Sequence, residues 1–299
     1  MSRYLDPKYD LTFKRVFGEH KHLCISLINS MLPFDEGREV VSIEYETGEL
    51  IPEIEMLKHA IVDVRCIDNF GRAFVVEMQF YWTTSFKTRV LFTASNAYVK
   101  QLEKSKKFKL LQPVYSINFI NGIFEKAPEM ADTYYHHYKI VNIEHTDHQI
   151  DGLEFVFIEL PKFKPANRAE KKLHELWLRF LTEIDEYTEE APDELLSCAE
   201  TQEAIHYMEV GAFTREQLQI YDNTRIGIMT AQSFIDDAEE KGLVKGLVKG
   251  EEIGLAKGLA KGRNEREIEI ARNLLSLGVS VENIAKSTGL TVEQINKYC

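Results

Sequence analysis

Hydrophobic and polar positions predict alternating helices and strands in the first half of the chain. Apolar side chains recur at helical spacing over residues 7–31, and Pro33 ends the run. Period-two alternation follows over residues 40–46, 60–68 and 73–80, which predicts three strands.

The same pattern continues with a second helix and a further set of strands. Residues 85–105 have helical periodicity, and residues 114–121, 138–143 and 153–160 are apolar strand-like runs. The order predicts a mixed α/β fold, a central sheet flanked by helices, as a domain over residues 1–165.

The rest of the chain is predicted to be helical. Residues 166–240 form an acidic helical subdomain that is broken near Pro192 and Gly211. The third region, residues 241–299, holds a glycine-rich tract and a short helical tail.

Glycine recurs every fourth residue in the tract, at Gly242, Gly246, Gly250, Gly254, Gly258 and Gly262. Such glycines weaken an isolated helix, yet they also form a smooth ridge that a second helix can approach closely. A hinge and an oligomer contact both remain open, and we favour a helix through which the chain forms a homo-oligomer. A lysine in nearly every repeat excludes burial in lipid.

Residues 281–298 fit a helix–turn–helix outline. Ser280 and Thr291 stand where two short helices would begin, and Gly289 stands at the turn between them. The second helix would read DNA, or the two helices would form a small packing module.

Composition limits the class of protein. No apolar run approaches the ~18 residues of a membrane span, so we expect no membrane partner. The first ten residues are too polar for a signal peptide. The cysteines lie far apart without a CxxC pair, which indicates a cytoplasmic protein with reduced thiols and argues against a disulfide scaffold or a zinc ribbon. They are Cys24, Cys66, Cys198 and Cys299.

The formal net charge of −12 argues, taken alone, against nucleic acid as a partner. The acidic residues are, however, unevenly distributed: residues 170–240 hold 18 Asp and Glu against five Lys and Arg. Residues 86–109 form a basic stretch with a single acid, Glu103. Its cations are Lys87, Arg89, Lys100, Lys104, Lys106, Lys107 and Lys109.

The residues best suited to catalysis or metal binding lie in the predicted hairpin over residues 60–80. A three-residue loop, Asn69–Gly71, makes the hairpin symmetric about Phe70 and places Asp63 directly opposite Glu77. Two opposed carboxylates destabilise a sheet unless something neutralises them. Protonation of one carboxyl would do so, and so would a divalent cation, Mg²⁺ or Mn²⁺. The remaining alternative is that one carboxylate pairs with Arg65 while the other faces solvent on an exposed strand face.

The histidines at residues 136–148 invite a zinc interpretation. His136 and His137 are adjacent, so on a strand they point to opposite faces, and no cysteine is near. We expect surface histidines here, including His145 and His148 beside Asp147.

The hairpin resembles a known nuclease signature. Asp63, followed thirteen residues later by Glu77-Met78-Gln79, is similar to the PD-(D/E)XK motif in its E-x-Q variant. The run Asp10-Leu11-Thr12-Phe13-Lys14-Arg15-Val16-Phe17-Gly18 resembles the opening of the PD-(D/E)XK nuclease family transposases, also called recombination-promoting nucleases. Arg89 with Tyr98, and Phe108 before Leu111–Ile117, add a third match.

The resemblance implies a PD-(D/E)XK restriction-endonuclease-like core and a metal-dependent endonuclease that acts on DNA in recombination or mobile-element movement. Asp63, Glu77 and the Met78 carbonyl would hold Mg²⁺ (or Mn²⁺), and Asp10 would complete the shell. Lys14, on the same helix face as Asp10, would bind phosphate or stabilise charge in the transition state; the alternative is a plain i,i+4 ion pair with Asp10.

Gln79 departs from the commonest pattern, which has lysine at this position. Glutamine orients water but supplies no positive charge. A catalytically weak or inactive DNA-binding or oligomerising protein that keeps the nuclease fold is therefore the alternative. Lys87, Arg89 and Tyr98 are the predicted DNA-binding residues. Lys87 and Arg89 begin the helix that would flank the site and would follow the phosphate backbone, with the Tyr98 ring nearby.

Overall fold

The computed structural model describes residues 3–46, 61–80, 85–104, 107–165 and 172–298. The chain divides into two compact units, Met1–Gln232 and Ser233–Cys299. The predicted division at residues 165 and 240 stays a prediction.

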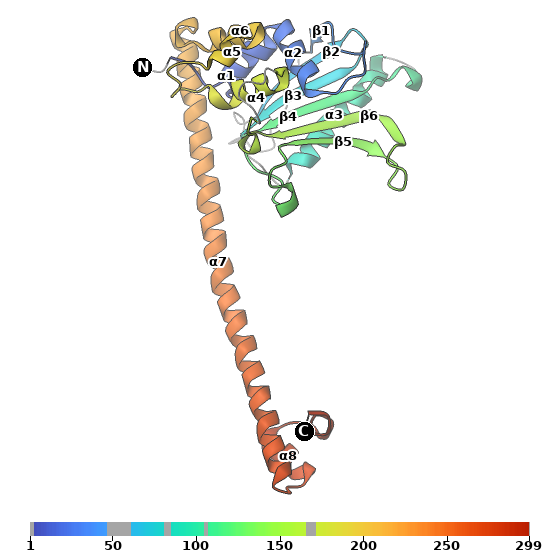
Figure 1. Cartoon of the computed structure of the whole chain (residues 1–299), viewed down its shortest axis with the longest axis vertical. Helices are drawn as coiled ribbons and strands as arrows, with labels where there is room; N and C mark the ends of the chain where they lie inside the picture. Colours follow the sequence, from blue (N-terminus) through green and yellow to red (C-terminus); the bar gives the residue numbers. More distant parts are fainter. Residues whose placement is uncertain (1–2, 47–60, 81–84, 105–106, 166–171, 299) are drawn as a thin grey trace. The chain divides into compact units, whose positions relative to one another are not determined.

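A six-stranded mixed sheet forms the centre of the first unit, with strand order β1-β2-β3-β4-β6-β5 (Figure 1). β3, β4 and β6 are parallel to one another. β2 lies antiparallel to β3, β1 lies antiparallel to β2, and β5 lies antiparallel to β6. The strands are β1 Ile43–Tyr45, β2 Ile61–Asp68, β3 Ala73–Gln79, β4 Val114–Ile120, β5 Tyr135–Val141 and β6 Gln149–Glu159.

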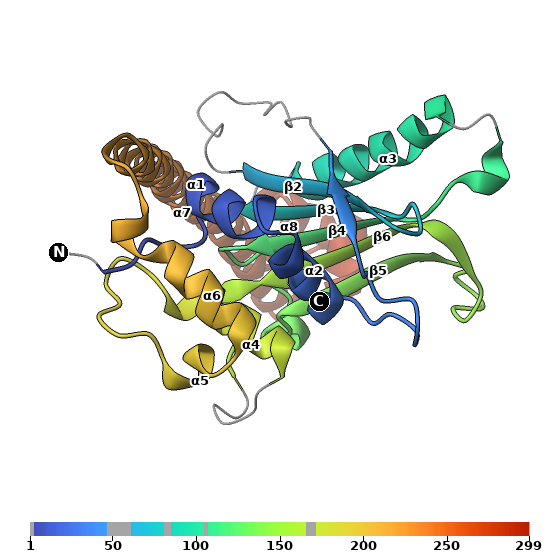
Figure 2. The same cartoon turned by 90° about the horizontal axis from the view of Figure 1, so that it is seen from above.

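Helices cover both faces of this sheet (Figure 2). α3, Phe86–Lys104, packs on one face, where Phe86 and Val90 contact Ile120 and Phe157. The other face is covered by α1 Asp10–Phe13, the π-helical turn η1 Lys14–Gly18, α2 Lys21–Met31 and α4 Leu173–Glu183. β3 is consequently buried at every position, and the predicted mixed sheet flanked by helices is confirmed.

The helix expected over residues 7–31 is interrupted, so that prediction was wrong in detail. α1 passes into η1, and the chain then turns at extended His20 before α2 begins. His20 Nδ1 lies 2.7 Å from the Arg15 carbonyl oxygen, which fixes the turn. Gly18 stands against Val64 of β2, so this turn packs directly on the sheet.

The acidic segment after the sheet folds into α4, α5 Asp193–Leu196 and α6 Ala199–Met208. As expected, Pro192 and Gly211 lie at interruptions, the first at the start of α5 and the second in a short turn after α6. These helices belong to the first unit, where Phe17 contacts Trp177 and Phe180 of α4.

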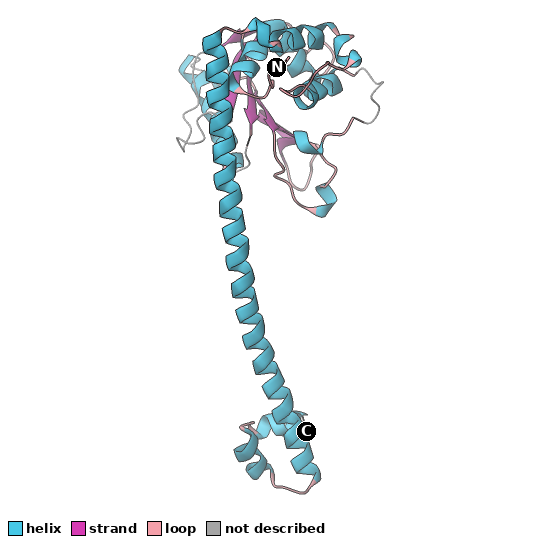
Figure 3. Ribbon diagram, turned by 90° about the vertical axis from the view of Figure 1, so that its left-hand side faces the viewer, coloured by secondary structure: helices cyan, strands magenta, loops and turns pink. Residues whose placement is uncertain are grey.

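The second unit holds the end of α7, Arg215–Ser276, with α8 Val281–Thr288 and α9 Val292–Tyr298 (Figure 3). Ala271, Ile284, Leu290 and Ile295 form its small core. Gly289 has φ +78° between α8 and α9. The glycine tract is helical throughout, as favoured over a hinge. Within the described residues, no helix combines the length and apolarity that a membrane crossing requires.

A buried charge network joins β5, β6 and the segment after β4. Glu159, fully buried at the end of β6, accepts hydrogen bonds from Lys162 Nζ (2.7 Å) and from the backbone N–H groups of Phe124 and Glu125. His136 Nε2 lies 3.0 Å from Glu159 Oε2, the oxygen that also accepts from Lys162, whereas the two backbone N–H groups bind Oε1. The expectation of a surface histidine is therefore wrong for His136, because its ring completes the shell around a buried carboxylate.

The pKa of Glu159 follows from two opposing causes. Burial raises it, but hydrogen bonds from Lys162, His136 and the two backbone N–H groups outweigh burial and lower it from 4.5. A carboxyl whose pKa is lower in the folded state stabilises the fold above its unfolded-state pKa, and this stabilisation is lost as pH falls through the folded-state value.

We expect Glu159→Gln to lower the free energy of unfolding by about 3 kcal/mol at pH 7, because Lys162 would lose its buried counter-charge. Urea unfolding at a series of pH values measures this. The difference between wild type and variant should begin to shrink below pH 4.5, where the carboxyl takes up its proton in the unfolded chain, and should be lost as pH falls through the lower pKa of the folded protein. Glu129→Gln, at an exposed position, is the control; equal losses in both variants would contradict the assigned network.

Candidate active site

The β2–β3 hairpin is held in register by its own loop. Asp68 Oδ1 accepts the N–H groups of Phe70 and Arg72, and Arg72 Nε donates to Asp68 Oδ2 at 2.7 Å. Gly71 has φ +81°, the left-handed conformation that glycine adopts readily at the last position of a three-residue hairpin loop. The loop therefore fixes which residues of β2 and β3 face one another.

Asp63 and Glu77 are direct partners in this register, as predicted. The Asp68 N–H donates to the Arg72 carbonyl, so alternation along an antiparallel ladder makes Asp63–Glu77 a non-hydrogen-bonded pair. Such pairs have the closer side-chain attachment points, with Cβ atoms about 5 Å apart. The Asp63 side chain itself lies outside the described part of the structure.

Glu77 and Gln79 are buried, with 1% and 2% of their surface exposed, so an ordinary exposed strand face is excluded. Both lie on the face of β3 that α3 covers. Arg89, in the first turns of α3, reaches both of them: Nη1 is 2.7 Å from Glu77 Oε1, and Nη2 donates to Gln79 Oε1 at 2.6 Å.

Sequence reasoning missed this contact of Arg89, although it selected the residue as a DNA contact. A signal did exist, because Arg89 lies ten residues after Gln79 at the start of the helix that follows β3. A cation there is well placed to neutralise a carboxylate on the strand beneath it.

Asp10 lies on α1 and Lys14 on η1, the turn that packs on β2 where Gly18 meets Val64. Lys14 Nζ is 2.8 Å from Asp10 Oδ1, and both side chains are about 40% exposed. Tyr9 contacts Phe80, with ring centroids 5.0 Å apart. Since Phe80 directly follows Gln79, α1 begins at the end of β3 that carries Gln79.

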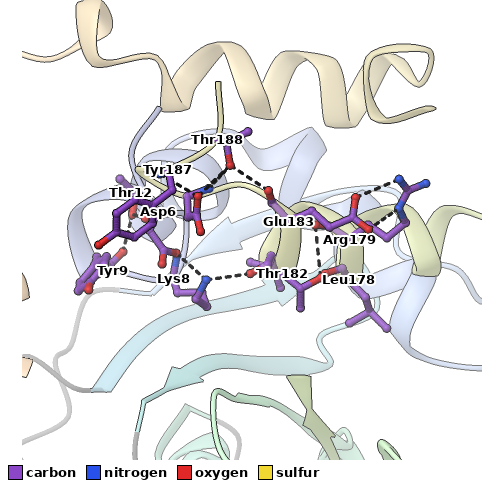
Figure 4. Close-up of polar contacts among 12 residues, drawn as sticks. Asp6, Lys8, Tyr9, Thr12, Leu178, Arg179, Thr182, Glu183, Tyr187 and Thr188 are labelled. Carbon is purple, nitrogen blue, oxygen red and sulfur yellow. Dashed lines mark hydrogen bonds and ion pairs between the residues drawn. The ribbon is translucent and has the colours of Figure 1, made fainter. Parts of the chain in front are cut away.

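A polar frame holds the start of α1 in place (Figure 4). Lys8 Nζ binds Asp6 Oδ1 at 2.9 Å and donates to the Leu181 carbonyl of α4. Thr12 donates to the Asp6 carbonyl. Burial raises the pKa of Asp6, with Lys8 opposing the shift. The frame ties the segment that carries Asp10 to the helices around it.

The remaining predicted DNA contacts lie apart along α3. Lys87 Nζ stands over the rings of Phe124 and Tyr138, 4.8 and 5.9 Å from their centroids. Tyr98 packs against Gly152 at the far end of β6. It lies nine positions after Arg89 in the helix, which is about 14 Å along the axis. The structure therefore groups Arg89, but not Tyr98, with Glu77 and Gln79.

A cavity of about 850 Å³ lies beside the site, between α3 and strands β1–β3. Arg65 and Val75 line it two residues from Asp63 and Glu77, and Lys100 brings one cation of the basic stretch. Lys106 of that stretch lies outside the described residues.

The donor chemistry fits a hard divalent cation, because Asp63 opposes Glu77 and both offer oxygen. Ladder alternation directs the Met78 carbonyl toward β2, and the second lone pair of that oxygen remains for a metal. Among the side chains that the structure describes, no three His, Cys, Asp or Glu gather as a metal cluster. That statement does not cover Asp63.

Comparison with known proteins gives two matches. The family model described as PD-(D/E)XK nuclease family transposase matches residues 7–238, which is most of the chain. The model of the Rpn/YhgA-like nuclease family, C-terminal HTH domain, matches residues 264–299. No curated protein and no solved structure matches the chain significantly.

The frame around α1 can be tested at Tyr221 of α7, whose hydroxyl accepts the buried Asp6 N–H at 3.0 Å. We expect Tyr221→Phe to lower the free energy of unfolding by about 1–2 kcal/mol, because the N–H would lose its acceptor. Chemical denaturation measures the change. Tyr187→Phe is the matched control, since that side chain is 81% exposed; an effect of the same size there would argue against the frame.

Proposed function

Because the chain belongs to the PD-(D/E)XK nuclease family transposases, we propose that it is a metal-dependent endonuclease that hydrolyses phosphodiester bonds in DNA. The observation that carries this proposal is the hairpin register. This register sets Asp63 directly opposite Glu77, and Glu77 stands two residues before Gln79. The family signature requires this arrangement.

In this proposal Asp63, Glu77 and the Met78 carbonyl hold Mg²⁺ or Mn²⁺, with Asp10 completing the shell directly or through water. The ion supplies Lewis-acid polarisation of the scissile phosphate and lowers the pKa of the attacking water. Gln79 orients that water by hydrogen bonding. Lys14, one turn from Asp10, offers a positive charge to the phosphate.

DNA is the proposed partner of both units. Lys87 and Arg89 lie at the start of α3, with Arg89 against Glu77 and Gln79 and Lys87 over the rings of Phe124 and Tyr138. Tyr98 lies further along the same helix. The helix–turn–helix domain supplies a second contact through α9. A capping box stabilises the start of α9: the Thr291 N–H donates to Gln294 Oε1, and the Gln294 N–H donates to Thr291 Oγ1. We place the cleavage in recombination or mobile-element movement, in the cytoplasm.

The activity is tested on supercoiled plasmid. We expect wild type to nick plasmid with Mg²⁺ and to lose activity in EDTA, because the opposed carboxylates need the ion to act. Asp63→Asn and Glu77→Gln should each lower the nicking rate at least about 100-fold, since each removes a metal ligand. Agarose gel electrophoresis over a time course measures the rate.

Glu129→Gln serves as the control, because it removes a carboxylate from an exposed position. Nicking that persists in both Asp63→Asn and Glu77→Gln would contradict the assigned site. Wild type that retains DNA in a gel-shift assay without nicking it would favour the alternative, a non-catalytic DNA-binding protein with the nuclease fold.

We propose in addition that the glycine tract joins two copies of the chain. The tract glycines have open space around their Cβ positions, so another helix can come close. A four-residue period exceeds 3.6, which winds the stripe into a right-handed crossing. Large apolar side chains lie exposed beside it, at Leu243, Val244, Leu247, Val248, Leu255 and Leu259.

Leu247 and Leu255 are 60% and 67% exposed, and substituting both with Asp puts charge on the proposed contact. We expect full-length Leu247→Asp/Leu255→Asp to have monomeric mass where wild type is oligomeric. Light scattering after size exclusion measures the mass. Lys249→Asp, on the same helix, controls for added acid; a variant that keeps the wild-type mass would exclude this contact.

A further inference from the structure

Arg89 bridges the two side chains that define the E-x-Q signature. Its side chain is 13% exposed, its Nη1 lies 2.7 Å from Glu77 Oε1, and its Nη2 lies 2.6 Å from Gln79 Oε1. The Arg89 Cζ also stands 5.1 Å from the Phe86 ring centroid, which supports the guanidinium from α3.

The geometry of the bridge requires an arginine. Residues i and i+2 of a strand are about 7 Å apart on one face. A planar guanidinium with two terminal nitrogens spans such a pair, whereas the single ammonium of a lysine is a point charge. One side chain from α3 therefore fixes two neighbouring side chains of β3.

The bridge also decides which way the Gln79 amide faces. The guanidinium carries hydrogen-bond donors only. It therefore donates to the amide oxygen of Gln79 and cannot pair with the amide NH2 group. The NH2 group of Gln79 consequently points away from Arg89. A lysine at this position would present a donor and a positive charge together; here the donor lies on Gln79 and the charge on Arg89.

We propose that Arg89 is a positioning residue of the nuclease site, which holds Gln79 as a hydrogen-bond donor and supplies the positive charge that glutamine lacks. The inference rests on the proposed function, because it assigns a role within the same site. It replaces the role of Arg89 as a phosphate contact at the surface, since the guanidinium is directed at Glu77 and Gln79.

The proposal has opposite consequences for metal binding and for cleavage. A guanidinium in contact with Glu77 repels a divalent cation, so its removal should strengthen metal binding. The same removal takes away the positive charge and the donor that binds the Gln79 amide oxygen, so cleavage should slow. A purely structural role would weaken both together.

The test uses full-length Arg89→Met, Arg89→Lys, Gln79→Lys and the double variant Gln79→Lys/Arg89→Met. Arg215→Met, an exposed arginine at the start of α7, is the matched control. We expect Arg89→Met to nick plasmid about 100-fold more slowly, and Arg89→Lys to recover only part of the loss. The double variant should return to within about tenfold of wild type, because lysine at position 79 restores donor and charge in one side chain.

Calorimetric titration with Mn²⁺ in the absence of DNA gives the second readout. Arg89→Met should bind Mn²⁺ several-fold more tightly than wild type, and Arg215→Met should bind it equally. Weaker Mn²⁺ binding together with a lower melting temperature in Arg89→Met would overturn the proposal in favour of a structural role. Unchanged nicking by Arg89→Met, or no rescue in the double variant, would also overturn it.

Failure of the proposed function has a different signature. Wild type that binds DNA without nicking it removes the endonuclease assignment, while the Mn²⁺ titration still decides whether Arg89 opposes a cation at Glu77. Equal Mn²⁺ affinities for wild type and Arg89→Met would then overturn the role of Arg89 as well.

Discussion

The contact between Arg89 and the buried Glu77 carboxylate is the interaction on which the arrangement of the site depends. A lone carboxylate with 1% of its surface exposed would be costly, because burial removes the water that stabilises its charge. The guanidinium at 2.7 Å compensates for that loss. It does so only if α3 lies over β3 with its first turns above Glu77. The helix that covers the sheet is thereby tied to the chemistry of the strand beneath it.

Two other polar clusters hold neighbouring elements of the site in position. The Asp68–Arg72 pair fixes the hairpin register and thus the partner of Glu77. The Asp6–Lys8 pair anchors the start of α1 at the end of β3 where Gln79 lies. In each cluster a buried carboxylate is paired with a buried cation and accepts a backbone N–H, which is what a charge inside a protein requires. Elements far apart in sequence are brought to one end of the sheet in this way.

The strands and the hairpin could be predicted because their signals are local. Period-two alternation located β2 and β3, and the loop with Gly71 determined that Asp63 faces Glu77. Local signals failed where distant contacts compete with them. The helix over residues 7–31 breaks because its turn packs on β2, and His136 is buried because Glu159 needs a partner. Neither partner is near in the chain.

The sequence by itself determined the register of the hairpin, the mixed order of helices and strands, and the family that these motifs indicate. The tertiary structure alone decided that Glu77 and Gln79 are buried and that Arg89 binds both. The reason is physical. Register within a hairpin follows from the turn that joins its strands, whereas the placement of a helix over a strand depends on the packing of the whole sheet, to which residues throughout the unit contribute.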